Sequence, residues 1–253
     1  MLKDTWIMAR RSLRHIVRSP DTVITVVMMP IALLLLFVYV FGGALGQQTH
    51  GLSYVNFLTP GIIIMTVISG IAYAAFRLSN DIQKGIINRF RTMPVAPSSI
   101  LGGQAASSTL SNLFSSLLVL AVAFAIGFRS HADVLMWLTF AGLVALFTLA
   151  TTWMAIFFGL AAKSAEGAGS FSYILMLLIF ISPSFVPTAS MTPALRAFAN
   201  NQPLTPIVET MRSLLTYGTP GPKIWLALAW CLAILIVFYL ASLRLYRTHT
   251  VSA

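Results

Sequence analysis

Charged residues and cysteine are scarce in this sequence. Only 9% of its 253 residues are Asp, Glu, Lys or Arg, whereas apolar types make up 58%. Soluble domains carry about 25% charged residues, so this chain has too few charges to cover a water-soluble domain of its length. The same balance excludes an intrinsically disordered chain. A single cysteine, Cys231, excludes an internal disulfide framework and a multi-cysteine metal site.

Charge is absent altogether from six apolar stretches that are candidates to cross the hydrocarbon core of a bilayer, about 30 Å thick. The stretches cover residues 22–45, 55–76, 98–128, 134–162, 171–186 and 224–243. They predict an all-α integral membrane protein with six transmembrane helices, in which residues 21–253 form one transmembrane domain.

The basic residues indicate the orientation of the chain. An even number of crossings puts both termini on one side, and 12 of the 16 Lys and Arg residues lie on that side. The other four are Arg129, Arg196, Arg212 and Lys223. Positive residues concentrate in cytoplasmic loops, so both termini are predicted to be cytoplasmic in a multi-pass protein of the inner (plasma) membrane. This distribution explains the net charge of +10 without a nucleic-acid partner.

Residues 1–20 are predicted to form an amphipathic helix at the membrane surface. Trp6, Leu13 and Val17 fall on one helical face, basic residues fall on the other, and Pro20 ends the pattern. Such a helix buries its apolar stripe among the lipid headgroups and pairs its arginines with anionic lipid. Membrane lipid is therefore a predicted partner.

The connection between the second and third stretches contains a further amphipathic pattern. Ile82, Ile86 and Phe90 recur at helical spacing, and Pro94 ends the run. The apolar side of this short helix suits either the membrane surface or a groove on a cytoplasmic partner. Periodicity leaves both interpretations open.

The amino-acid sequence of this connection resembles that of a known family. Asp81-Ile-x-Lys-Gly-Ile-Ile-x-Arg-Phe-Arg-x-Met-Pro-Val is similar to the inner loop of the daunorubicin-resistance (DrrB-like) ABC-2 type transporter permeases, the membrane subunits of ATP-binding-cassette exporters. Other pieces resemble the same family in the same order. They are Phe57-Leu-Thr-Pro-Gly61, Ser184-Phe-Val-Pro187 with Met191, and the segment from Asn201 to Leu215.

The resemblance implies a six-helix subunit with a coupling helix in its first inner loop. Two permease subunits, as a homodimer or a heterodimer, would pair with two copies of a separate ABC ATPase that binds ATP and magnesium. The ATPase-coupling residues carried over are Asp81, Ile82, Lys84, Ile86, Arg89, Phe90 and Arg91. The chain itself has no Gly-x-x-x-x-Gly-Lys-Ser/Thr phosphate loop, so no nucleotide cofactor is expected in it.

Enzymatic alternatives find little support. All four histidines lie outside the six stretches, and no stretch contains an acidic pair, a metal-binding pattern or a serine-nucleophile motif. An intramembrane enzyme and a structural scaffold therefore remain as alternatives, but no residue pattern in the sequence supports either of them. We expect a non-catalytic subunit that exports an amphiphilic, drug-like or antibiotic-like molecule, because a charge-free interior suits such cargo. A lipid or lipid-linked glycan is the alternative cargo.

Polar residues of the third stretch share one helical face. They indicate either a wall of the cargo path or subunit seam, or hydrogen bonding to neighbouring helices as packing. In the second stretch, Pro60 and Gly61 predict a break or bend. The candidate substrate-path residues are Pro60, Gly61, Gln104, Ser108, Ser111, Ser115, Phe185, Met191 and Met211.

The segment between Ser182 and Lys223 contains seven prolines, which exclude a continuous helix. Residues 206–217 still show an apolar helical face, with Glu209 and Arg212 opposite it, one turn apart, where they can pair. About 12 residues are too few to span a bilayer. The segment is predicted to be an outer re-entrant helical segment, and a surface helix resting on lipid is the alternative.

Overall fold

The computed structural model describes residues 24–46, 52–84 and 97–251. Within these ranges the chain forms helices and loops and no strand, as the sequence predicts. The helices are η1 (Ile24–Met28), α3 (Met29–Leu36), η2 (Phe37–Phe41), α4 (Gly42–Leu45), α5 (Tyr54–Gln83), α7 (Pro97–Ala125), α8 (Val134–Ala161), α9 (Ala165–Gly169), α10 (Phe171–Ile181), η4 (Thr188–Ser190), α11 (Pro193–Asn201), α12 (Leu204–Arg212), η5 (Ser213–Tyr217) and α13 (Ile224–Val251). The predicted amphipathic helix of residues 1–20 lies outside the described residues.

Among the described residues, four helices are long and apolar enough to cross a membrane. They are Tyr54–Gln83, Leu101–Ala125, Val134–Ala161 and Ile224–Tyr246. Two further apolar helical stretches, Val26–Phe41 and Ala165–Ile181, are shorter. All six overlap predicted spans, so the helices are consistent with an all-helical integral membrane protein, and helix length and composition by themselves support four crossings.

The helix bounds differ in places from the bounds of the predicted spans. The fifth stretch was expected to reach residue 186, but α10 ends at Ile181. Ser182 is extended because the proline that follows it disfavours helical backbone at the preceding residue. The last helix, α13, continues beyond residue 243 to Val251. The second stretch is not broken at Pro60, because α5 runs through it as one helix, and a bend there stays a prediction.

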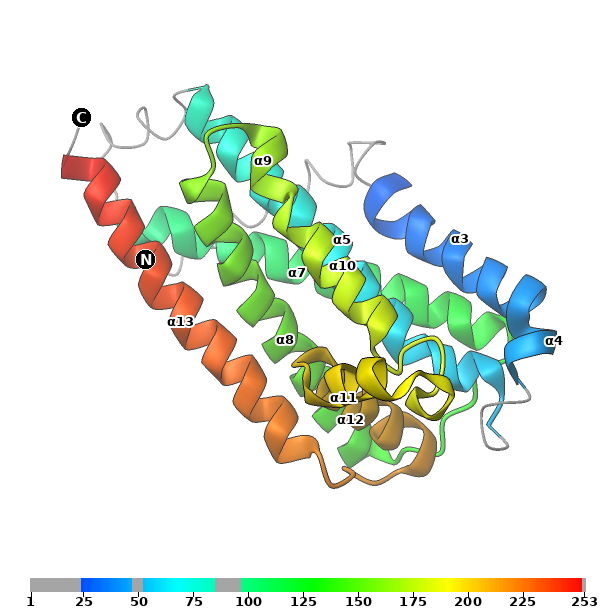
Figure 1. Ribbon diagram of the computed structural model, residues 1–253. Helices are drawn as coiled ribbons and strands as arrows, with labels where there is room; N and C mark the ends of the chain where they lie inside the picture. The colour runs from blue at the N-terminus through cyan, green and yellow to red at the C-terminus, as the bar shows by residue number, and fades with distance from the viewer. Residues whose placement is uncertain (1–23, 47–51, 85–96, 252–253) are drawn as a thin grey trace.

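Helix α5 is the centre of the bundle. It packs against α3, α7, α8, α9, α10 and α12. Of its most apolar 18-residue segment, 89% is buried inside the protein. Ile62, Ile64, Ile68 and Ile71 of α5 have no exposed surface. Helix α13 lies at one edge of the bundle beside α8, as Figure 1 shows. The core of the bundle is therefore formed around α5, the second predicted span, and not around α13, which is the most apolar span.

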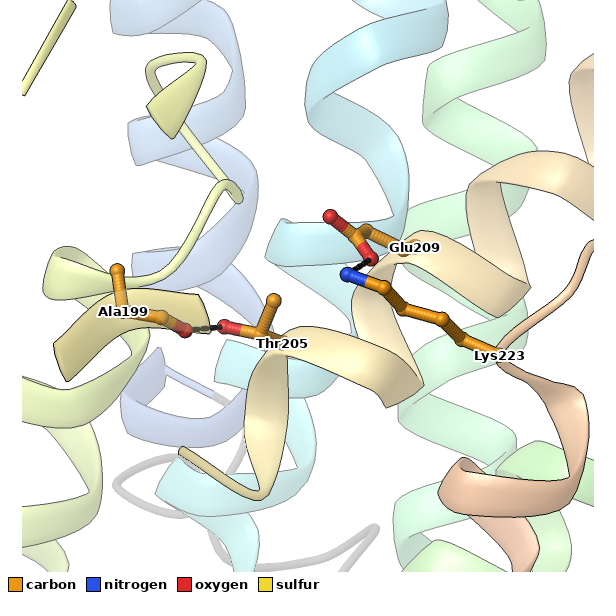
Figure 2. Close-up of polar contacts among 4 residues, drawn as sticks. All are labelled: Ala199, Thr205, Glu209 and Lys223. Atoms are coloured by element: carbon orange, nitrogen blue, oxygen red, sulfur yellow. Dashed lines mark hydrogen bonds and ion pairs between the residues drawn. The ribbon is translucent and has the colours of Figure 1, made fainter. Parts of the chain in front are cut away.

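The segment between α10 and α13 folds over one end of the bundle. Figure 1 shows α11 and α12 at the end opposite α9, and we call these the α12 end and the α9 end. The Thr205 hydroxyl donates to the Ala199 carbonyl, joining α12 to α11 (Figure 2). Gln202 Nε2 donates to the Leu178 carbonyl at 2.9 Å, tying the same turn to α10. As predicted, no single helix covers this proline-rich segment.

Candidate functional site

Arg212, the last residue of α12, is a cation inside the protein, with 8% of its surface exposed. Its Nε and Nη2 donate to the Phe57 carbonyl at 3.1 and 2.9 Å, and Nη2 also donates to the Pro183 carbonyl at 2.6 Å. The guanidinium carbon lies 3.7 Å from the centre of the Phe57 ring. Bonds from a charged donor and a cation–π contact both stabilise a buried guanidinium. We call Phe57, Gly61, Pro183, Ser184 and Arg212 the Arg212 cluster.

The sequence around Gly61 explains why these segments meet. A Cβ at residue 61 would lie 2.7 Å from the Ser184 Cβ, so only glycine permits this approach. The close approach brings the Pro183 carbonyl within reach of Arg212. The cluster thereby joins all three pieces that lie outside the inner loop and carry the family resemblance: the Phe57–Gly61, Ser184–Pro187 and Asn201–Leu215 motifs.

The expected pairing of Glu209 with Arg212 is wrong. Glu209 Oε2 instead lies 2.6 Å from Lys223 Nζ, as Figure 2 shows, and Arg212 has no ion-pair partner among the described residues. Arg212 is directed to the α5 backbone, whereas Glu209 is partly exposed. Arginine keeps its proton in folded proteins, so the guanidinium is a cation at neutral pH.

The loop between α7 and α8 is bonded to the same end of α5. Asn56 Nδ2 donates to the Arg129 carbonyl at 2.7 Å, and the Arg129 amide donates to Asn56 Oδ1 at 3.0 Å. The Ser130 hydroxyl donates to the Leu215 carbonyl at 2.7 Å. Sequence reasoning missed Asn56, although an amide beside a predicted proline kink was a usable signal. These bonds hold the loop, α5 and η5 together.

The polar face of α7 packs against α5. Ser108 and Ser115 are buried, while Gln104 and Ser111 are partly exposed. Nearby, a Cβ at Gly70 would lie 1.6 Å from Asn112 Oδ1, so the two helices touch at this glycine. Three of the four residues, Gln104, Ser108 and Ser111, line a small pocket of about 20 Å³ together with Arg77. This arrangement matches interhelical packing at small and polar residues.

The other candidate substrate-path residues lie at the α12 end. Pro60, Gly61 and Met211 are buried. Phe185 is 3% exposed, packs against the Phe37 and Phe180 rings, and its carbonyl accepts from the Tyr54 hydroxyl. Met191 is partly exposed in the loop before α11. The structure thus separates the candidates into two groups, and their role as a cargo path stays a prediction.

The described coupling residues lie at the α9 end. Asp81 and Ile82 are in the last turn of α5 and are partly exposed, and Lys84 follows as an exposed residue. Gln83 Nε2 donates to the Lys163 carbonyl at 3.3 Å, which ties this end of α5 to the loop before α9. The remaining coupling candidates, Ile86, Arg89, Phe90 and Arg91, lie outside the described residues.

The arrangement defines a class of protein. Large apolar side chains are exposed on α3, α7, α10 and α13, as expected for helices that face lipid. The central helix instead buries polar groups, and one end of it holds the Arg212 cluster. This combination is that of a polytopic integral membrane protein.

Residues 3–216 match the ABC-2 type transporter family, and the chain belongs to it. It is 28% identical over 230 residues to the daunorubicin resistance ABC transporter permease protein DrrB1 of Streptomyces coeruleorubidus, covering 90% of this chain and 80% of that protein. It is 26% identical to the inner membrane transport permease YadH of Escherichia coli, covering 76% of this chain and 74% of that protein. It is 23% identical to the probable doxorubicin resistance ABC transporter permease protein DrrC of Mycobacterium tuberculosis, covering 92% of this chain and 84% of that protein.

These matches confirm the predicted family. Members of the ABC-2 family are generally non-catalytic membrane subunits, and membership implies pairing with an ABC ATPase. The chain is therefore an ABC transporter permease located in a membrane.

Proposed function

We propose that this chain is the permease subunit of an exporter that moves an amphiphilic, drug-like or antibiotic-like molecule out of the cell. ATP hydrolysis on a separate ATPase subunit, which binds ATP and magnesium, supplies the energy. Two of the relatives bear the names of daunorubicin and doxorubicin resistance, which supports this cargo class. A lipid or lipid-linked glycan is the alternative cargo.

The observation that carries the proposal is the course of α5. Its 30 residues extend about 45 Å, which exceeds the hydrocarbon thickness of about 30 Å. One end carries Asp81 and Ile82 of the coupling segment, and the other end carries Phe57 and Gly61 of the Arg212 cluster. Because α5 is packed on nearly all sides, a displacement at the coupling end is transmitted to the Arg212 cluster.

In this proposal the α9 end is cytoplasmic, and the α12 end faces outward. The unbroken helical run from Ile24 to Leu45 has 22 residues, about 33 Å, and is long enough to be the first of six crossings. The stretch Ala165–Ile181 extends only about 25 Å. The fifth crossing therefore stops short of the outer surface, and α11 and α12 complete it as a re-entrant segment, of which α12 is covered by protein and α11 is mostly exposed. Both termini are cytoplasmic.

The cargo passes between two permease subunits. The small pocket between α5 and α7 and a larger pocket of about 220 Å³ at the α12 end share no lining residue, so they do not form a channel that connects the two ends of the bundle. A path along a subunit seam needs no channel within one chain. Two ATPase copies, each docked on one coupling segment, would tilt the two permeases and open the seam outward.

Reconstitution with the partner ATPase tests this proposal. Ile86→Asp and Phe90→Asp place a charge on the apolar docking face, so we expect ATPase binding and cargo-stimulated ATP turnover to fall at least tenfold. Ala161→Asp, an exposed position near the same end, is the matched control. Wild-type binding and turnover in both docking variants would contradict the proposal. Export of a fluorescent anthracycline compared with a fluorescent lipid from proteoliposomes separates the two cargo classes.

A further inference from the structure

A pocket of about 220 Å³ opens at the α12 end, between α12, η5 and the residues that lead into α13. Its lining includes Glu209, Thr210, Arg212, Ser213, Tyr217 and Lys223. One water molecule requires about 10–15 Å³. The pocket therefore has room for a polar group of several atoms.

The lining carries an excess of positive charge. Arg212 and Lys223 are cations, and Glu209 is the one carboxylate in the lining. Lys223 is paired with Glu209 at 2.6 Å. Arg212 uses Nε and Nη2 in its three hydrogen bonds, and its Nη1 donates to no group in the described part of the chain. The pocket therefore has a net charge of about +1 and guanidinium hydrogens available to an acceptor.

A buried hydroxyl in the same lining also lacks a partner. Thr210 is 1% exposed, and its Oγ1 forms no hydrogen bond within the described ranges. Buried polar groups are nearly always hydrogen-bonded, because leaving one unpaired costs free energy. A ligand oxygen in the pocket would supply the missing partner.

The pocket adjoins the beginning of a long helix. The Lys223 carbonyl accepts from the Ala227 amide at 2.9 Å, so Lys223 directly precedes the first residue of α13, Ile224. The first amides of its 28 residues have no intrahelical acceptor and form the positive end of the helix dipole. An anion beside Lys223 is stabilised by both the side chain and the helix end.

Aromatic residues indicate that the pocket lies at headgroup depth. Tyr217, in the lining, is 60% exposed, and Trp225, in the first turn of α13, is 78% exposed. Tyr and Trp are enriched where hydrocarbon meets headgroups. From this level Leu226, Trp230 and Val237 extend along α13 as exposed apolar side chains.

We propose that this pocket binds the monoanionic phosphodiester of a membrane phospholipid, with the acyl chains lying along α13. One negative charge matches the net charge of the pocket, and the phosphate oxygens accept from Arg212, Thr210 and Lys223. The exposed apolar face of α13 favours a lipid over free phosphate, which has no chains to cover it. The assignment to the outer leaflet rests on the orientation in the proposed function.

Equilibrium binding of a fluorescent phosphatidylglycerol to the purified full-length chain in neutral detergent tests the proposal. We expect unlabelled phosphatidylglycerol to compete, and equal concentrations of diacylglycerol and inorganic phosphate not to compete. If inorganic phosphate competes equally well, the pocket recognises a free anion and not a lipid. If diacylglycerol competes equally well, the pocket does not recognise the phosphate. Either result overturns the proposal.

Three variants locate the site. Lys223→Gln is expected to weaken binding about tenfold, and Thr210→Val about threefold. In the double variant Glu209→Gln with Lys223→Gln the net charge returns to +1, so part of the affinity should return. Lys163→Gln at the α9 end is the control. Equal affinity of Lys223→Gln and Lys163→Gln would refute the proposal.

This binding needs no ATPase. A lipid site can therefore fail while ATPase docking succeeds, or the reverse, and the two proposals are distinguishable. Thermal unfolding of each variant, followed by circular dichroism, shows whether a loss of binding comes from a loss of folding.

Discussion

Helices α5 and α13 have similar lengths but opposite surroundings. The most apolar 18-residue segment of α5 is 89% buried, whereas the corresponding segment of α13 is 11% buried. Yet α13 is the more hydrophobic of the two. Apolarity therefore does not determine which helix occupies the centre of this protein.

The physical reason is the solvent. Lipid tails are as apolar as leucine, so a hydrophobic helix gains little by leaving them, and association depends on close packing and polar contacts. Helix α5 has Gly61 and Gly70, where neighbours approach closely, and Asn56, which bonds to a loop. Helix α13 exposes bulky residues such as Trp225 and Val237. Four comparisons, each of a variant with its control, test this contrast from the largest expected effect to the smallest.

Arg212→Met should have the largest effect. It leaves the Phe57 and Pro183 carbonyls without their charged donor at the end of α5, at a cost of about 3 kcal/mol in unfolding free energy. Arg196→Met is the control, since Arg196 also donates to backbone carbonyls but is exposed. Denaturant unfolding in detergent measures both. Equal losses would show that burial of Arg212 does not matter.

A pair of matched truncations compares the two helices directly. Ile68→Ala in α5 removes a side chain with 0% exposure and should cost about 2 kcal/mol. Ile236→Ala in α13, where the side chain is 55% exposed, should change stability by less than about 0.5 kcal/mol. The same unfolding assay measures the difference. A larger loss for Ile236→Ala would place a protein partner, rather than lipid, on α13.

Gly70→Ala tests the contact between α5 and α7. The new Cβ would lie 1.6 Å from Asn112 Oδ1, so the helices must separate at a cost of about 1–2 kcal/mol. Gly142→Ala is the control, because nothing lies within 4 Å of that position, and helix propensity should make it neutral or slightly stabilising. Adding Asn112→Ala should restore part of the stability of Gly70→Ala. Failure of this rescue would contradict the assigned contact.

Asn56→Ala should have the smallest of the four effects. It removes two hydrogen bonds to the backbone of Arg129, and we expect a loss of about 1 kcal/mol and faster amide exchange in the loop between α7 and α8. Asn201→Ala, which removes one exposed bond to the Ala197 carbonyl, is the control. Unchanged exchange at residues 129–131 would show that Asn56 does not hold the loop.

Much of the helix order follows from the sequence. The apolar runs predict every long helix, because the backbone in lipid must bond internally. Prolines predict that the segment after α10 is not one helix, and Pro183 accounts for the end of α10. The continuous course of α5 through Pro60 could not be read in this way. Pro60 removes one backbone hydrogen bond, to the Asn56 carbonyl, and the segments packed around α5 hold the helix together across this position.

The candidate site was predicted only in pieces. The three motifs that meet at Arg212 were recognised separately, but Arg212 was expected to face Glu209 on a polar surface. Helical spacing reports which residues share a face, and it does not report which face is buried. The partners of Arg212 are backbone carbonyls, which have no signature in sequence.

The sequence by itself determined the solvent of this protein, its helical class and its family, because long charge-free runs and local motifs are properties of the chain. Only the tertiary structure decided that α5 is central, that α13 is peripheral and that Glu209 pairs with Lys223. Those outcomes depend on short contacts between segments far apart in the chain, such as Gly61 with Ser184. In lipid, where hydrophobicity no longer sorts helices, such contacts decide the arrangement.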